Sequence, residues 1–211
     1  PQGTGMRARR REPVVETHDL AMHFGGVRAV DGVDFTLYDG ELRCLIGSNG
    51  AGKSTFFKCL TGQLTPSGGR VSIKGRDVTG VEPHQVAGLG VGIKTQVPNV
   101  YDGLPVEENI WLSARRWHDA RGAKRLTAET IERLQLGDIR RRMAGQLAHG
   151  QRQQVELGMV MAAEPWLVLL DEPAAGMTHE ETARTAEIIR EINTTAALIV
   201  VEHDMHFIRA I

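Results

Sequence analysis

The fold is decided by the stretch Gly47-Ser48-Asn49-Gly50-Ala51-Gly52-Lys53-Ser54, which fits the phosphate-loop pattern GxxxxGK followed by Ser or Thr. It follows a short apolar run, residues 42–46, and opens a segment expected to be helical, residues 53–60. In this order of strand, glycine-rich loop and helix, backbone N–H groups can surround a polyphosphate at the helix N-terminus. We therefore expect a nucleotide site here, and with both flanks present an ordinary glycine-rich turn is the weaker interpretation.

Side chains at the end of this loop add polar chemistry. Lys53 is expected to meet the β- and γ-phosphates, and Ser54 offers a hydroxyl to Mg²⁺. Thr55 can hydrogen-bond a phosphate oxygen beside it. The expected nucleotide contacts of this stretch are Gly47, Ser48, Asn49, Gly50, Ala51, Gly52, Lys53, Ser54 and Thr55.

A second motif ends the apolar run 167–170 with two acids, Asp171 and Glu172, followed by Pro173. Open parallel sheets place their ligands at the carboxyl ends of strands. Neighbouring strand residues point to opposite sides of a sheet, so the two acids are expected to have different roles. They could act from the same side only if the backbone turns there, which Pro173 favours. We expect Asp171 to hold Mg²⁺ through water and Glu172 to polarise the attacking water. Without other motifs, such an acidic pair is more often part of a helix cap or a turn. With the phosphate loop present, a catalytic site is the stronger interpretation.

The apolar pattern on either side of these motifs predicts an α/β fold. The N-terminal part indicates an antiparallel β lead-in, with a strand at 14–20, a turn at Gly25-Gly26 and alternating apolar residues from 33 to 37. After residue 150, helices at 150–163 and 180–192 alternate with strands at 167–170 and 198–201. This alternation predicts a mostly parallel sheet.

The segment 99–146 lacks apolar runs and is rich in helix formers. Two helices are expected within it, at 106–116 and 128–136, with polar residues interleaved. We interpret the segment as a helical insert that packs against the main sheet.

Composition limits the partners and the compartment. The 211 residues are 41% apolar and 24% charged, enough for one core with at most a small satellite. Since 25 basic residues balance 26 acidic ones, no overall field attracts nucleic acid. The longest apolar runs fall far below the ~20 residues of a membrane-spanning helix. Residues 1–11 are polar and Arg-rich, resemble no secretory signal, and are expected to be a flexible N-terminus outside the fold.

With these motifs in place, the chain resembles the ATPases of the ATP-binding cassette (ABC) family over essentially its whole length. The segment Leu147-Ala148-His149-Gly150-Gln151 is similar to the family signature LSGGQ, with Ala148 in place of Ser and His149 in place of the first Gly. The resemblance implies that Ala148, His149, Gly150 and Gln151 close over ATP held by an opposing subunit. Two chains would then sandwich two ATP molecules head to tail. Without the family context, the segment would be a plain helix N-terminus.

Three single residues gain a role only through this resemblance. Gln96 matches the glutamine of the family's Q-loop, whose amide reaches Mg²⁺ or the attacking water. His203 matches the switch histidine that hydrogen-bonds the γ-phosphate, and Phe24 resembles the aromatic that stacks on adenine. By themselves they would be a loop residue, a structural histidine and a core aromatic. A metal pair of His203 with His206 is disfavoured, because no third ligand matches it.

The implied fold is a P-loop NTPase of the ABC cassette type: a mostly parallel sheet flanked by helices, with the antiparallel lead-in and a helical subdomain. Residues 12–211 would form a single nucleotide-binding domain, with the helical subdomain at about 99–163 inserted in its RecA-like core. ATP and Mg²⁺ are the implied substrate and cofactor.

Several short sequence segments resemble those of one subgroup of the family. FGGVRAV at 24–30, PAAGMT at 173–178 and VEHDM at 201–205 are similar to the ATPases of hydrophobic and polar amino-acid and amide importers. The signature segment together with ELGM at 156–159 resembles the urea-type branch more than the branched-chain amino-acid branch. Thr178 departs from the Asp that ends the corresponding loop in the family.

The resemblance therefore implies an ATP-hydrolysing importer motor for branched-chain or polar amino acids, urea or amides. Its partners would be transmembrane permease subunits, a second identical or paralogous ATPase subunit and, indirectly, a solute-binding protein, with no nucleic acid. It would be cytoplasmic and peripheral on the inner face of the cell membrane. Two alternatives stay open: a lipid or lipopolysaccharide exporter ATPase, and a soluble ABC protein acting on ribosomes or DNA. A single phosphate loop and the lack of sustained heptads disfavour the second.

Overall fold

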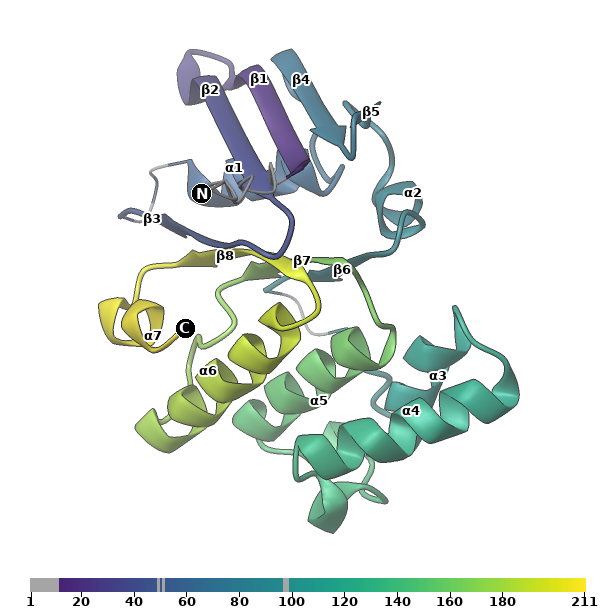
Figure 1. The fold of residues 1–211 in the computed structure, drawn as a ribbon. Coiled ribbons are helices and arrows are strands. Elements are labelled where there is room, and N and C mark those ends of the chain that lie inside the picture. Colours follow the sequence, from purple (N-terminus) through teal and green to yellow (C-terminus); the bar gives the residue numbers. More distant parts are fainter. Residues whose placement is uncertain (1–11, 49, 51, 97–98) are drawn as a thin grey trace, which may run out of the picture.

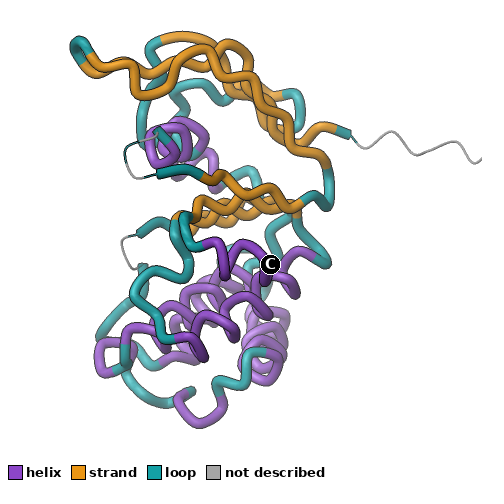
Figure 2. The backbone as a smooth tube through the Cα atoms, turned by 90° about the vertical axis from the view of Figure 1, so that its left-hand side faces the viewer, coloured by secondary structure: helices purple, strands orange, loops and turns teal. Residues whose placement is uncertain are grey.

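The computed structural model describes residues 12–211 except 49, 51, 97 and 98. The expectations for the N-terminus, Asn49 and Ala51 therefore lie outside the described residues. Figures 1 and 2 show four stacked layers: an antiparallel sheet, the helix α1 (Lys53–Leu60), a parallel sheet and a layer of helices. The predicted α/β class, with a parallel sheet and an antiparallel lead-in, is confirmed.

The antiparallel sheet has the strand order β2-β1-β4-β5. Apolar residues of its long hairpin, among them Leu20 and Leu37, are fully buried, because one face of the sheet packs on α1 and the other faces solvent. The hairpin turns at Gly25, whose φ of 57° is the left-handed conformation that glycine adopts without strain. The strands are β1 (Pro13–Phe24), β2 (Val27–Tyr38), β4 (Gly68–Ile73) and β5 (Arg76–Asp77).

The second sheet is parallel throughout, in the order β3-β8-β7-β6. Every residue of its two central strands is buried. Both faces of the sheet are covered, which explains why these strands are continuous apolar runs in the sequence. The strands are β3 (Leu42–Ile46), β6 (Val91–Lys94), β7 (Leu167–Asp171) and β8 (Ala197–Glu202).

Most of the helices cover the face of the parallel sheet opposite α1 (Figure 1). The predicted positions of α5 and α6 agree with the structure to within a residue at each end. The helices are α2 (Pro83–Ala87), α3 (Val106–Arg115), α4 (Ala120–Arg133), α5 (His149–Ala162), α6 (His179–Asn193) and α7 (Met205–Ala210), with 3-10 turns at Gly137–Ile139 and Ala144–Gln146.

One predicted helix was wrong in its bounds. The second helix of the insert was expected at 128–136, but α4 begins at Ala120 and ends at Arg133. Asp119 starts it earlier by accepting the backbone N–H of Gly122 at 2.7 Å, which is an N-cap bond. Gly122, a poor helix former, concealed this first turn. Gln135 closes the helix with a left-handed φ of 54°.

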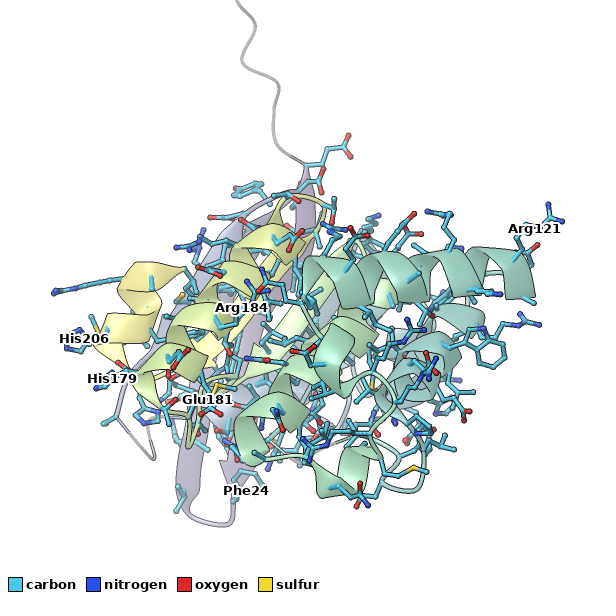
Figure 3. All side chains as sticks on the ribbon, turned by 90° about the horizontal axis from the view of Figure 1, so that it is seen from below. Phe24, Arg121, His179, Glu181, Arg184 and His206 are labelled. Carbon is cyan, nitrogen blue, oxygen red and sulfur yellow. The ribbon has the colours of Figure 1, made fainter. Side chains whose placement is uncertain are left out.

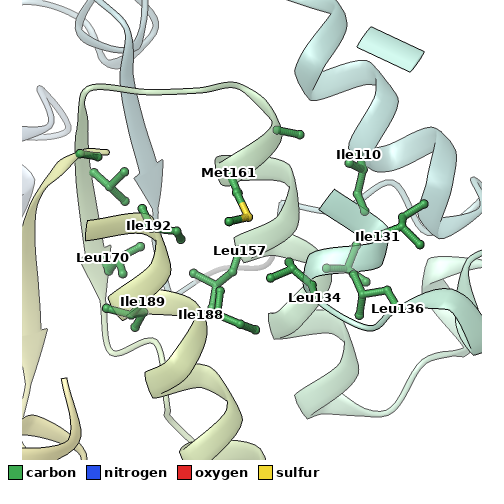
Figure 4. Packing of buried hydrophobic residues seen from close by; sticks show 14 of the residues in the cluster. Ile110, Ile131, Leu134, Leu136, Leu157, Met161, Leu170, Ile188, Ile189 and Ile192 are labelled. Atoms are coloured by element: carbon green, nitrogen blue, oxygen red, sulfur yellow. The ribbon is translucent and has the colours of Figure 1, made fainter. Parts of the chain in front are cut away.

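The helical layer is held together by an apolar cluster centred on α5. Leu157 and Met161 project from α5 between α6 on one side and α3 and α4 on the other (Figure 4). Through these contacts α5 joins the helical insert to the sheet. Within the described part of the chain, none of the helices is both long and apolar enough to span a bilayer.

Candidate nucleotide site

The phosphate loop leaves β3 and enters α1 through two left-handed glycines, Gly50 at φ 83° and Gly52 at φ 85°. Gly52 is the N-cap of α1. A Cβ added to Gly52 would lie 2.1 Å from the carbonyl oxygen of Ala29, so any other residue there would be both strained and in collision with β2. The loop is thereby fixed tightly against the antiparallel sheet.

The side chain of Lys53 lies within the curve of this loop. Its Nζ donates to the carbonyl oxygens of Gly47 and Ser48, the latter at 2.8 Å. No acidic residue occupies the first turn of α1, where the unpaired N–H groups and the helix dipole attract negative charge. Ser54 and Thr55 follow in that turn, half-buried. A glycine cradle, an ammonium and a helix N-terminus together fit a polyphosphate.

Asp171 ends β7 in a buried position, 4% exposed. Its Oδ1 has no hydrogen-bond partner among the described residues. Burial, and next the neighbouring Glu172 carboxylate, raise the pKa of Asp171, while Lys58 and Lys94 act in the opposite direction. A buried acceptor in this electrostatic setting fits a divalent cation or its water ligands, as expected for Mg²⁺.

The backbone turns at Glu172, whose φ is 47°. This left-handed conformation is uncommon for a residue other than glycine, and the N–H of Glu172 is anchored to the carbonyl of Val201 at 2.9 Å. The turn lets Asp171 and Glu172 serve the same edge of the sheet. It also brings the Glu172 Oε1 to 3.7 Å from the Nδ1 of His203, which follows β8.

Glu202, whose role was not predicted from the sequence, holds the backbone near both Glu172 and His203. Its carboxylate, 2% exposed, accepts the N–H of His203 at 2.9 Å, of Asp204 at 3.3 Å and of Ala174 at 3.3 Å. It thus ties the turn after Glu172 to the turn that carries His203. The sequence signal for Glu202 was its position as an acid at the end of an apolar strand, the same position that Asp171 has in β7.

The signature-like segment opens α5 at some distance in sequence from these acids. Ala148 and His149 are exposed, and the Oε1 of Gln151 accepts the N–H of Ala148 at 3.2 Å. The Nε2 of His149 lies 2.9 Å from the carbonyl oxygen of Ala175, so the segment is joined to the loop that follows Glu172.

Thr178 has a local role that explains its departure from Asp. Its hydroxyl accepts the N–H of Glu181 at 3.3 Å, and the Glu181 Oε2 accepts the N–H of Thr178 at 2.9 Å. This reciprocal pair caps α6, and Thr and Asp are both good N-cap residues. The substitution therefore preserves the helix start.

Two other residues that were predicted to contact nucleotide or Mg²⁺, Phe24 and Gln96, are exposed. Phe24 is 46% exposed at the tip of the β1–β2 hairpin (Figure 3), so the interpretation as a core aromatic is wrong. Gln96 is exposed, two residues after β6 ends. Among the described residues, no hydrogen bond or ion pair joins Phe24 or Gln96 to the phosphate loop.

The sequence matches a known protein family. A sequence model described as ABC transporter matches residues 30–175, which is more than half of the chain. The chain belongs to the ABC transporter family.

Individual ABC proteins are similar to this chain over most of its length. The high-affinity branched-chain amino acid transport ATP-binding protein BraF of Pseudomonas aeruginosa is 33% identical over 94% of this chain and 85% of its own length. Its counterpart LivG of Escherichia coli is 34% identical, over 95% and 86%. The ADP conformation of MJ1267, an ATP-binding cassette of an ABC transporter, superposes with a TM-score of 0.81 at 25% identity, covering 95% of this chain and 85% of that one. The sequence-based family prediction is confirmed, and the chain is an ABC ATPase.

The support that Glu202 gives to this ABC ATPase can be measured. Replacing Glu202 by Ala leaves three backbone N–H groups without their acceptor, that of Ala174 buried and those of His203 and Asp204 partly buried, which costs roughly 2 to 4 kcal/mol of unfolding free energy. We expect Glu202→Ala to lower the urea midpoint accordingly and to lower ATP turnover, because Glu172 and His203 lose their common anchor. Urea denaturation and a phosphate-release assay test this. A variant with wild-type stability and turnover would contradict the anchoring role.

Proposed function

We propose that this ABC ATPase is the motor of an importer for branched-chain or polar amino acids, urea or amides. The observation that carries the proposal is the set of Lys53, Asp171, Glu172 and His203, each placed after a strand end of the parallel sheet or on it, in a chain about one third identical to branched-chain amino acid transport ATP-binding proteins. These relatives favour the amino-acid branch, while the spellings at 147–151 keep urea and amides open.

The site residues divide the hydrolytic work. The amides from Gly47 to Thr55 and the ammonium of Lys53 bind the phosphates, and Phe24 offers an exposed ring for adenine. Glu172 orients and polarises the attacking water, and His203, 3.7 Å away, donates to the γ-phosphate. Ser54, Asp171 and Gln96 would hold Mg²⁺, which would supply positive charge to offset the negative charge that develops on the phosphates during hydrolysis.

A second copy or paralogue would complete each site. Ala148 and His149 are exposed at the N-terminus of α5, where unpaired N–H groups favour an anion. The phosphate loop of the same chain already supplies one helix N-terminus, and a nucleotide has a second face to cover. Two chains paired head to tail would therefore enclose two ATP molecules, with Ala148, His149, Gly150 and Gln151 of each covering the other's phosphate.

A groove beside the Gln96 loop offers a surface for the permease. It has a volume of about 350 Å³ and lies where α2, β6, α3 and α5 meet. Its lining includes His84, Trp117 and Met159, with Thr95 and Asn99 on the side of the Gln96 loop. A permease segment seated there at the inner face of the membrane would contact both the helical insert and the sheet.

Reconstitution tests the proposal. The chain would be purified from its native source with its membrane partners, which are then identified, and reinserted into liposomes. We expect copurification of permease subunits, and ATP turnover that rises when a solute-binding protein loaded with leucine, isoleucine, urea or an amide is added. Stimulation by a lipid instead would favour the exporter alternative, and cosedimentation with ribosomes or DNA in place of a permease would overturn the transport role.

A further inference from the structure

Glu156 of α5 contacts the chain on both sides of Gln96. Its Oε2 lies 3.4 Å from the Nζ of Lys94, the last residue of β6. Its Oε1 accepts the backbone N–H of Asn99 at 2.5 Å. Since Lys94 precedes Gln96 and Asn99 follows it, a single carboxylate holds the two ends of the Gln96 loop.

The charged pair is buried, with 3% of the Lys94 side chain and 5% of the Glu156 side chain exposed. Burial lowers the pKa of Lys94, opposed by the nearby carboxylates of Glu156, Asp171 and Glu202. A buried ion pair is weak evidence for stability, because desolvation offsets most of the attraction. The pair is nevertheless held in place, since separating the two side chains would leave the Glu156 carboxylate in the interior without its cation. This favours a role in position over a role in stability.

Two further sets of contacts fix the position of α5, the helix that carries Glu156. Arg152, one turn before Glu156, pairs with Asp102 at 2.8 Å and so ties the helix to the segment after Asn99. Leu157 and Met161 fix the opposite side of α5 in the apolar cluster (Figure 4). These contacts hold the helix from two sides, and its N-terminus carries the signature-like residues that start at Ala148.

We infer that Glu156 is a positioning residue of the ATPase, which clasps both ends of the Gln96 loop and links that loop to the signature segment. The inference rests on the proposed function, because it assigns Gln96 and the signature segment to one hydrolytic cycle. Lys94 and Glu156 also line the groove described above. A segment bound in the groove would press on the clasp and so shift the Gln96 loop and the signature helix together.

Neutral substitutions separate the clasp from simple stability. Lys94→Met and Glu156→Gln each leave one buried charge unpaired, and both should lower the urea midpoint and ATP turnover. The double variant has no unpaired charge, and the side-chain amide oxygen that replaces the carboxylate can still accept the Asn99 N–H. We expect its urea midpoint to return near the wild-type value while its turnover stays at least about fivefold low, as for a cycle that has lost an orienting contact. The affinity of the isolated subunit for ATP should stay within about twofold, since the phosphate loop is untouched.

The conservative variant Glu156→Asp is a second test that does not need the double variant to fold. It keeps the charge but withdraws the carboxylate by one methylene, so turnover should fall while affinity for ATP is kept. Faster amide exchange at Asn99 would report the loosened clasp directly. Arg133→Gln is the control, because Arg133 pairs with Glu191 at 2.6 Å on the exposed surface between α4 and α6 and does not line the groove. It should leave turnover within about twofold of wild type.

The outcomes separate the inference from the function beneath it. An active wild-type chain whose double variant regains both stability and turnover, or whose Glu156→Asp variant keeps full turnover, would show that the pair is only structural and overturn the inference. A folded wild-type chain that hydrolyses no ATP would overturn the proposed function itself, and the inference with it.

Discussion

Glu172→Gln should abolish steady-state ATP turnover while leaving ATP binding intact. The amide keeps nearly the shape of the carboxylate but cannot accept a proton from water, so hydrolysis should slow by on the order of 10² to 10⁴-fold. The phosphate loop is unaffected. A pair of subunits that has closed on ATP should then persist, because separation follows hydrolysis. Phosphate release, nucleotide binding and size-exclusion chromatography with ATP and Mg²⁺ measure the three effects.

A neighbouring acid provides the matched control for this substitution. Glu180→Gln removes an exposed carboxylate from the first turn of α6, where a negative charge contributes only a few tenths of a kcal/mol. It should turn over ATP at the wild-type rate. Undiminished hydrolysis by Glu172→Gln would exclude Glu172 as the group that activates water.

Lys53→Ala should weaken nucleotide binding itself. The ammonium lies inside the loop, 2.8 Å from the Ser48 carbonyl oxygen, and among the described residues no other cationic side chain donates a hydrogen bond to the loop. Losing a charge-assisted contact to phosphate costs about 3 kcal/mol, or on the order of 10²-fold in the dissociation constant. Calorimetric titration with ATP measures it directly.

The control for this prediction is Lys124→Ala, which removes an exposed lysine on α4. It changes the net charge equally and should leave the affinity within about twofold. An equal loss of affinity in both variants would indicate a general charge effect and contradict the specific role of Lys53.

The phosphate loop and its flanks could be predicted from the sequence because local rules dominate there. Left-handed glycines, an apolar strand and a helix start lie within a few residues of one another, and α1 was expected at its observed bounds, Lys53–Leu60. The same holds for the buried central strands, whose unbroken apolar runs follow from cover on both faces.

What escaped prediction depends on contacts between distant segments. Glu156 and Asn99 are 57 residues apart, and Ala174 and Glu202 are 28 apart, so no local pattern reveals either bond. The start of α4 was missed for a local reason, because Gly122 lowered the helix signal that Asp119 restores by capping. The phosphate loop fixes where nucleotide binds, while these long-range carboxylates fix how the surrounding turns are held.

Calorimetry of the folded wild-type chain with ATP, in the presence and absence of Mg²⁺, is the most direct test that this loop grips a triphosphate. We predict saturable binding of about one ATP per chain, tightened by Mg²⁺ and lost in Lys53→Ala. A chain shown to be folded by circular dichroism that releases no heat of binding with ATP, whether or not Mg²⁺ is added, would contradict the account.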